Sequence, residues 1–261
     1  LVVALHGCSQ TAKAMAEQSG WNELAVKHQF VVIYPQQKIS NNGSNCFNWF
    51  KEKDITKHSG ETQSIKSMID FAVKNYDIDT SKIFIYGLSA GAAMGVSMMA
   101  NHPETFRAGA IFAGAPYKIA TSVNQAFKAM SGKIDKTPEE WGRLVPNDSM
   151  RVTYPKLIVF HGEKDVVVDS KNANELIEQW SYLHQTNAKQ DSVIINYANN
   201  KNIQRISYWN KNKEEVIAYY KMTNIGHALP IDPGGKEKQG GKKGPFARDI
   251  DFFSTYYVAL D

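Results

Sequence analysis

The sequence predicts an α/β fold with a mostly parallel central sheet and helices on both faces. The first observation is that short runs of β-branched and aromatic residues alternate with longer stretches in which apolar residues recur at helical spacing. This order is typical of parallel strands joined by crossover helices. The second is the pentapeptide Gly87-Leu88-Ser89-Ala90-Gly91, which lies between one such strand and one such helix. This turn is too tight for side chains at its glycines, and it raises the serine hydroxyl above the sheet edge.

Strands and helices alternate regularly through the first part of the chain. Apolar residues recur every 3.6 residues along 62–76, which indicates a helix with one buried face. The small and Met-rich run 92–100 indicates a buried helix directly after the serine turn. We expect, in order, strand 1–5, helix 14–28, strand 30–34, a long polar loop 36–60, helix 62–76, strand 82–86, helix 90–101 and strand 108–113.

The pattern changes between residues 117 and 153, where short helical pieces near 123–130 and 138–141 replace the strands. A cap over a site is commonly inserted at this place in such folds, and a plain surface excursion is the alternative. No internal repeat and no linker divides the chain, so we expect residues 1–261 to form one domain. The later elements expected are strand 155–160, helix 171–186, a hairpin with arms around 206–208 and 216–220, and a final helix 246–258.

The serine turn predicts partners at later positions of the chain. In hydrolases with such a turn, the nucleophilic serine is followed in sequence by an acid and then by a histidine. Strand 155–160 leads into the loop that carries Asp165, and strand 216–220 leads into the loop that carries His227. The carboxyl ends of parallel strands meet at one sheet edge, so we expect Ser89 as nucleophile, His227 as base and Asp165 as the acid that orients the imidazole.

Other residues near these positions are alternatives for the acid and the base. Glu163 and Asp169 are rival acids, because both flank Asp165 in the same loop. His184 also follows Asp165, but it lies in the helical pattern of residues 171–186, so we interpret it as a surface or packing residue. His6 precedes the serine, and we interpret it as a hydrogen-bonded residue that shapes its loop.

An oxyanion hole is the fourth part of such a site. One donor is expected to be the backbone N–H of Ala90, the residue after the nucleophile. The other is expected from the loop that follows strand 1–5, where Gly7 lets the backbone turn its amides toward a substrate oxygen.

Six motifs along the chain are Leu5-His6-Gly7-Cys8-Ser9-Gln10, Tyr34-Pro35-Gln36-Gln37, Cys46-Phe47-Asn48-Trp49-Phe50, Gly87-Leu88-Ser89-Ala90-Gly91, His161-Gly162-Glu163-Lys164-Asp165 and Gly226-His227-Ala228. Together they resemble a known family, the secreted poly(3-hydroxybutyrate) depolymerase-like esterases, which are related to feruloyl and acetylxylan esterases. The resemblance implies an α/β-hydrolase fold, the triad Ser89, Asp165 and His227, and the Cys8 amide as second oxyanion donor. Residues 229–233 of this chain depart from the family, whose members often have a Trp and a Gly-rich stretch directly after the histidine.

The sequence contains two cysteines, Cys8 and Cys46. Both are expected on loops that leave adjacent strands at the same sheet edge, and the resembled family is secreted, so we expect them to form a disulfide. Two reduced thiols that pack separately are the alternative. Two cysteines cannot form a Cys₄ metal cage, and we expect neither a metal nor a cofactor.

The composition of the chain excludes several other classes of function. Its net charge is only +4, and the one basic run, residues 234–244, has interleaved glycines and no aromatic residues, so we expect a solvated, mobile loop and no nucleic-acid partner. No run of apolar residues is long enough to predict a membrane span. Leu1 opens directly into a core strand, so we expect upstream residues, including a secretion signal. The resemblance to a secreted family implies that the protein is secreted, and we expect it to be a monomer.

The leading hypothesis is therefore a serine carboxylic-ester hydrolase that acts through an acyl-enzyme on polyhydroxyalkanoate-type polyesters or short-chain acyl esters. A feruloyl or acetylxylan esterase, a serine peptidase of the same fold and a non-catalytic binding protein are the alternatives. Trp49 and Tyr117 lie on loops expected to rim the cleft, where an aromatic ring could contact the acyl group. The alternative for both is that they only pack their loops down.

Overall fold

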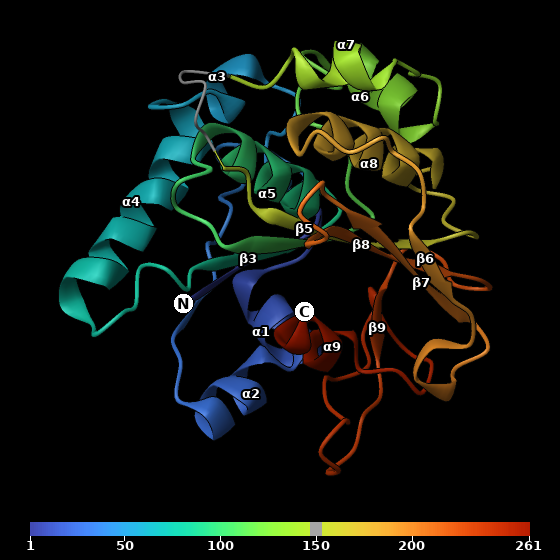
Figure 1. The fold of residues 1–261 in the computed structure, drawn as a ribbon. Coiled ribbons are helices and arrows are strands. Elements are labelled where there is room, and N and C mark those ends of the chain that lie inside the picture. The colour runs from blue at the N-terminus through green and yellow to red at the C-terminus, as the bar shows by residue number, and fades with distance from the viewer. Residues whose placement is uncertain (147–152) are drawn as a thin grey trace.

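The computed structural model describes residues 1–146 and 153–261, which form a central sheet with helices on both faces (Figure 1). The predicted fold class is confirmed. Within the described residues the sheet has eight strands in the order β2-β1-β3-β4-β5-β8-β7-β6. Neighbours from β2 to β8 pair in parallel, and the β8-β7-β6 edge is antiparallel. The strands are β1 (Val2–Leu5), β2 (Val32–Ile33), β3 (Phe84–Leu88), β4 (Ala108–Phe112), β5 (Lys156–Gly162), β6 (Ser192–Ile194), β7 (Ile203–Trp209) and β8 (Glu215–Met222).

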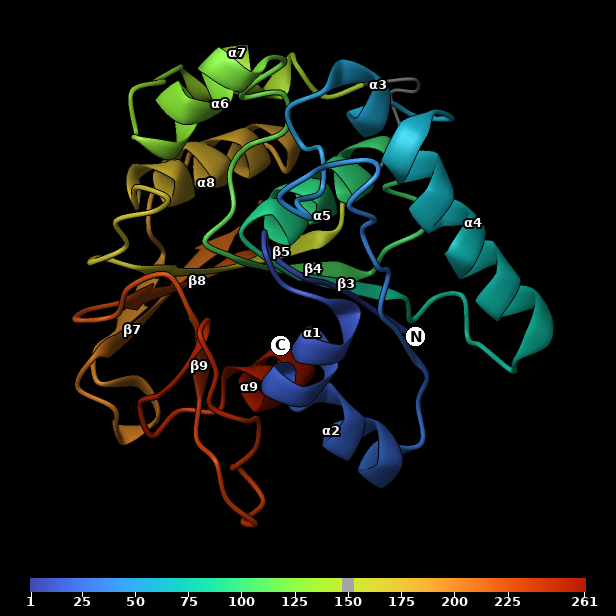
Figure 2. The same ribbon diagram turned by 180° about the vertical axis from the view of Figure 1, so that it is seen from behind.

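Helices form a layer on each side of this sheet, as both views show (Figures 1 and 2). One layer contains α4 (Gly60–Asn75), α5 (Ala90–Asn101) and α8 (Lys171–Leu183). The opposite layer contains α1 (Ala12–Ser19), α2 (Trp21–His28) and α9 (Ser254–Leu260). The remaining elements are the short helices α3 (Glu52–Ile55), α6 (Val123–Met130) and α7 (Pro138–Gly142), the 3₁₀ turn η1 (Tyr197–Asn199), and a second small sheet of β9 (Leu229–Ile231) and β10 (Ala247–Asp249).

A row of aromatic rings fixes the neighbouring strands of the sheet to one another. It contains Tyr86 on β3, Phe112 on β4, Phe160 on β5 and Tyr220 on β8, all buried on the side of α1, α2 and α9. Successive ring centroids lie 4.7, 4.3 and 4.2 Å apart, and the last two pairs are nearly parallel. Since β3, β5 and β8 lead into the loops of Ser89, Asp165 and His227, this row also holds the frame of the candidate site.

Two expected helices differ from the structure. The helix expected at 14–28 is broken at Gly20, which has φ 74° and in which a Cβ would overlap the ring of Phe253. The prediction of a final helix at 246–258 is wrong for the first half of that range. Ala247–Asp249 pairs with Leu229–Ile231 as a parallel strand, and the helix begins only at Ser254. Tertiary pairing overrides the local helical pattern there.

Residues 117–153, where a cap or a surface excursion is expected, form α6 and α7 in their described part. These helices lie outside α8, on the far side of it from the sheet (Figure 1). Trp141 of α7 donates a hydrogen bond of 2.6 Å to Glu175 of α8, which fixes the two helices together. Residues 147–152 of this segment lie outside the described residues. A search of the described helices for one long and apolar enough to cross a membrane found none.

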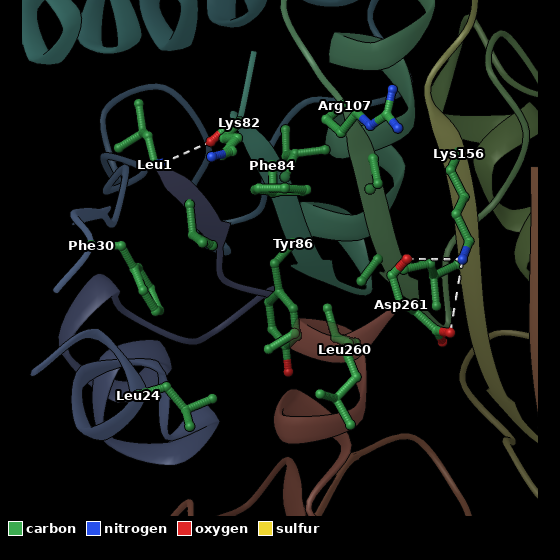
Figure 3. Close-up of a pocket in the computed structure, with 18 of the residues that line it drawn as sticks. Leu1, Leu24, Phe30, Lys82, Phe84, Tyr86, Arg107, Lys156, Leu260 and Asp261 are labelled. Atoms are coloured by element: carbon green, nitrogen blue, oxygen red, sulfur yellow. Dashed lines mark hydrogen bonds and ion pairs between the residues drawn. The ribbon is translucent and has the colours of Figure 1, made fainter. Parts of the chain in front are cut away.

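A pocket of about 1120 Å³ lies on the face of α2 and α9 (Figure 3). Its apolar lining includes Leu24, Phe30 and Tyr86, and Lys156 and Asp261 form an ion pair at its rim. The pocket extends along the amino-terminal ends of β1, β3, β4 and β5, whereas Ser89 and Asp165 follow the carboxyl-terminal ends. It is therefore separate from the site described below.

Candidate active site

Ser89 lies at a sharp turn between β3 and α5, as the sequence predicts. Its backbone has φ 57° and ψ −122°, a conformation that costs energy in any residue other than glycine. The turn closes on itself: a Cβ at Gly87 would lie 2.5 Å from the carbonyl oxygen of Gly91, and a Cβ at Gly91 would overlap that of Leu5. Both glycines are thus required for the serine to stand above the edge of the sheet.

Asp165 and His227 lie on loops that follow the adjacent parallel strands β5 and β8. The two loops are joined by a backbone hydrogen bond of 3.0 Å from Lys164 to Ile225. Asp165 Oδ2 and His227 Nδ1 lie 2.7 Å apart. A carboxylate only accepts, so Nδ1 carries the proton and Nε2 of the neutral ring is free to accept one.

The surroundings of Asp165 favour its ionised form. Burial opposes ionisation, but the hydrogen bond and charge of His227 and the amides of Val167 and Val168 outweigh it, so the pKa of Asp165 is lowered from 3.8. Each amide donates to Oδ1 at 2.9 Å. This leaves Oδ2 for the imidazole.

The rival residues have other partners in the described parts of the chain. Glu163 is exposed and pairs with Lys221 at 2.8 Å, and Asp169 accepts a hydrogen bond of 2.9 Å from the Lys171 amide. His184 lies at the other end of β5, with Nε2 3.2 Å from the carbonyl oxygen of Pro155. The geometry therefore groups Asp165, and neither rival acid, with His227.

The loop after β1 lies directly beside the serine. A Cβ at Gly7 would lie 3.3 Å from Cβ of Ser89. Among the described residues the amides of Cys8 and Ala90 donate no hydrogen bond, whereas the Gly7 amide is taken by Gln10 at 2.8 Å. The two predicted oxyanion donors are thus free to bind a ligand oxygen.

The structure contains the predicted disulfide between Cys8 and Cys46, whose Cα atoms lie 4.1 Å apart. It joins the loop after β1 to the long loop after β2. Ser9 donates a further backbone hydrogen bond of 2.9 Å to Ser44 across the same two loops. The loop with the Cys8 amide is therefore fixed to the loop with Trp49.

A buried polar network that the sequence did not indicate supports these loops. The ring of His6 is fully buried, and its Nε2 accepts a hydrogen bond of 3.1 Å from the Gln37 amide, so its Nδ1 donates to the Gly7 carbonyl at 2.8 Å. Glu61 accepts from the side chain of Gln37 and from both the backbone and side chain of Asn48, at 2.5 to 2.7 Å. Burial raises the pKa of Glu61. His6 shapes its loop as expected. Asn48 lies in a motif of the resembled family and Glu61 in none, but the sequence did not indicate their contacts with each other, because these are visible only in the fold.

The structure treats the two predicted substrate-contact aromatics differently. Trp49 is half-buried, and its ring packs edge-on against Phe50 at 5.5 Å. Tyr117, in contrast, is 1% exposed, and its hydroxyl donates to the carbonyl of Ile55 at 3.2 Å. The prediction of a substrate contact for Tyr117 is corrected here: its ring is part of the core and packs its loop down.

One acidic cluster has the spacing of metal ligands, but it lies in the small sheet region and not at the serine. Carboxylate oxygens of Asp232, Asp249 and Asp251 lie within 4.8 Å of one another. Lys243 pairs with Asp249 at 2.9 Å, and Gln239 donates to Asp232 at 3.2 Å. Protein partners thus account for this cluster, and we assign no metal to it.

A serine at a tight strand-to-helix turn, an acid and a histidine on successive loops, and a parallel sheet between helical layers define an α/β-hydrolase. The family model described as "Esterase PHB depolymerase" matches residues 1–193 of this chain. The chain belongs to that family.

Relatives agree with this assignment. The chain is 41% identical to poly(3-hydroxyalkanoate) depolymerase C of Paucimonas lemoignei over 99% of its own length and 62% of that protein. It is 31% identical to a probable acetylxylan esterase A of Aspergillus fumigatus, over 88% of the chain and 62% of that protein. The chain thus spans about three fifths of the length of these relatives. The solved acetyl xylan esterase from Aspergillus awamori superposes with a TM-score of 0.79 at 23% identity, covering 87% of this chain and 82% of that one, which shows the shared fold.

Proposed function

We propose that this protein is a serine carboxylic-ester hydrolase in which Ser89 is the nucleophile, His227 the base and Asp165 the acid. The observation that carries the proposal is the 2.7 Å contact between His227 Nδ1 and Asp165 Oδ2 at the sheet edge from which Ser89 rises. The Ser89 hydroxyl forms no hydrogen bond with His227 among the described residues. Catalytic hydrogen bonds of free enzymes often form only when substrate is bound.

The proposed reaction has two halves. Oγ of Ser89 attacks the ester carbonyl carbon while Nε2 of His227 takes the hydroxyl proton, and the Cys8 and Ala90 amides stabilise the oxyanion. The ester C–O bond then breaks, and His227 returns the proton to the leaving alcohol. In the second half, water attacks the carbonyl carbon of the acyl-serine while His227 takes a proton from the water. The bond between that carbon and Oγ of Ser89 then breaks, His227 returns the proton to Oγ, and a carboxylic acid leaves. Asp165 stabilises the imidazolium in both halves.

Polyhydroxyalkanoate-type polyesters or short-chain acyl esters are the substrates we favour. Val166 and Val167, directly after Asp165, are 96% and 41% exposed, so an apolar chain segment finds contact surface beside the acid loop. Trp49, on the loop held by the disulfide, is the aromatic residue we propose as a second substrate contact. The name of the 41%-identical relative, a poly(3-hydroxyalkanoate) depolymerase, supports the same substrate class.

The second candidate substrate class is an acetylated or feruloylated plant polysaccharide. The similarity to a probable acetylxylan esterase and to a feruloyl esterase B favours it. We also propose that the protein works in an oxidising compartment outside the cytoplasm, because a disulfide persists there and is rare in reducing compartments.

A comparison of rates tests the function and separates the substrates. Polyhydroxybutyrate film, nitrophenyl butyrate, acetylated xylan and methyl ferulate are assayed side by side, with the Ser89→Ala variant as control. We expect the variant to lose on the order of 10³–10⁶-fold in kcat, as other triad knockouts do. Hydrolysis of the film and of nitrophenyl butyrate supports the polyester proposal, whereas preference for acetylated xylan or ferulate favours the second candidate. Hydrolysis that survives in Ser89→Ala contradicts the mechanism.

A further inference from the structure

His161 is a buried histidine that the proposed mechanism does not use. It lies on β5, four positions before Asp165, and is 1% exposed. Its Nε2 is 2.9 Å from the carbonyl oxygen of Val168. A carbonyl oxygen only accepts, so Nε2 carries the ring proton. Its Nδ1 has no hydrogen-bond partner in the described parts of the chain.

The ring of His161 lies beside the turn that carries Asp165. Val168 is held at both ends of the turn: its amide donates to Asp165 Oδ1 at 2.9 Å, and its carbonyl accepts from His161. His161 Nε2 is also 3.6 Å from Asp165 Oδ2, the oxygen that contacts His227. The N–H of His161 therefore fixes the turn that presents Asp165 and lies close to the carboxylate itself.

A residue that served packing alone would be apolar at this position. A buried nitrogen without a partner destabilises the folded state, and the unpaired Nδ1 of His161 is such an atom. What an apolar side chain could not supply is the N–H bound to Val168. The chemistry of the ring thus points to a role for that donor.

The ring also stays neutral beside the acid. Burial lowers the pKa of His161, and the Val168 carbonyl and the charges of Asp165 and Asp169 oppose this without reversing it, while His227 adds to it. A neutral ring adds no second positive charge at the carboxylate. Asp165 is then left to stabilise the imidazolium that forms at His227 during catalysis.

We propose that His161 is a positioning residue for Asp165: its Nε2–H holds the Val168 carbonyl, so that Oδ1 is bound by two amides and Oδ2 points at His227. This inference rests on the proposed function, because it assigns a role to His161 only through the triad.

The test compares three variants of the same chain. His161→Leu keeps an apolar side chain of moderate size and removes the donor, whereas His161→Gln keeps a side-chain N–H. His184→Leu is the matched control, because His184 is another histidine of lowered pKa whose Nε2 contacts a backbone carbonyl, that of Pro155, at the far end of β5. Each variant is assayed with nitrophenyl butyrate across pH, and its melting temperature is recorded.

We expect His161→Leu to lose on the order of 10–100-fold in kcat with little change in KM, since misplacing a catalytic group by about 1 Å can cost on the order of 10²-fold. The acid limb of its kcat/KM profile moves to lower pH, because a misaligned carboxylate stabilises the imidazolium of His227 less. His161→Gln restores most of kcat and the profile of the parent protein. His184→Leu lowers the melting temperature and leaves the profile unchanged.

A His161→Leu protein that is folded and retains the kcat and pH profile of the parent overturns the inference, as does an equal shift in the profile of His184→Leu. These results leave the proposed function intact, provided that hydrolysis by the parent protein requires Ser89. Hydrolysis by the parent protein that does not require Ser89 overturns the proposed function, and the role of His161 with it.

Discussion

Asp165, the proposed acid, is oriented by the backbone around it. Glu163, Asp165 and Asp169 share one loop, and the sequence favours Asp165 by its position after a strand and by the resemblance of its motif to a known family. The structure supplies the physical reason: two amides bind one oxygen of Asp165 and leave the other for His227. The contacts of His161 and Glu61 could not be predicted, because nothing in the residue pattern indicates which groups of the folded loops they meet.

At the residue scale, Asp165→Asn tests the acid. The variant should keep its fold, because an amide has nearly the same shape, and should lose on the order of 10⁴-fold in kcat, since the imidazole is then held in the wrong tautomer. Hydrolysis of nitrophenyl butyrate measures this. Glu163→Gln is the control. Its kcat should stay within about twofold of the parent value, because an exposed charge away from the reacting atoms contributes little. A larger loss of kcat in Glu163→Gln than in Asp165→Asn would assign the role of the acid to Glu163.

The pH dependence of kcat/KM tests the base. Only a neutral imidazole can take the Ser89 proton, so kcat/KM should rise with pH and then reach a plateau in mild alkali. Asp165 does not limit the rate in this range, because its lowered pKa keeps it ionised. A profile that is flat from pH 5 to pH 8, measured with one substrate at constant ionic strength, would exclude a histidine base.

At the scale of elements, the parallel strands were well predicted and the region after His227 was not. Strands buried on both faces are continuous apolar runs, so 108–113 and 155–160 were found within about two residues of β4 and β5. The segment 246–258 is predicted as one helix, but the backbone of Ala247–Asp249 pairs with β9. Long-range pairing of three-residue strands leaves no periodic signal in the sequence.

The disulfide is predicted to stabilise the oxyanion loop. It closes a loop with a sequence separation of 38, so reduction should lower the free energy of unfolding by about 3–4 kcal/mol and the melting temperature by about 6–16 °C. Hydrolysis of nitrophenyl butyrate should fall as well, because the Cys8 amide loses its fixed position. The Cys8→Ser/Cys46→Ser double variant serves as the reductant-free comparison. A melting temperature and a rate of hydrolysis that stay unchanged after complete reduction would contradict this role of the disulfide.

The aromatic row is predicted to be the main packing element beneath the site. Phe160 stacks on Phe112 and Tyr220, so Phe160→Ala should lower the free energy of unfolding by about 3–5 kcal/mol. Phe127→Ala is the control: its side chain is 66% exposed, and the expected change is within about 0.5 kcal/mol. Denaturant unfolding measures both. A similar loss in the two variants would show that the row contributes no special stability.

At the scale of the whole molecule, buried histidines predict sensitivity to acid. Burial lowers the pKa of His6, His102, His161 and His184 below 6.5. The unfolded chain therefore binds protons at a pH where the folded protein does not, so this stability is complete above pH 6.5 and is lost as the pH falls. The slope is at most about 1.4 kcal/mol per pH unit for each histidine.

Denaturant unfolding at pH 7.5 and pH 5.5 measures this loss. We expect a clearly smaller free energy of unfolding at pH 5.5, and a smaller difference between the two values in His184→Leu, which removes one of the four groups. A free energy of unfolding that is equal at the two pH values would contradict this account.

We propose that Ser89 is the residue that becomes acylated, and covalent labelling identifies that residue. The protein is treated with a fluorophosphonate, its intact mass is measured, and the modified peptide is sequenced by mass spectrometry. We expect a single adduct, located on Ser89, that is absent from Ser89→Ala and forms more slowly in Asp165→Asn. An adduct on another residue, or none in a protein that hydrolyses esters, would contradict it.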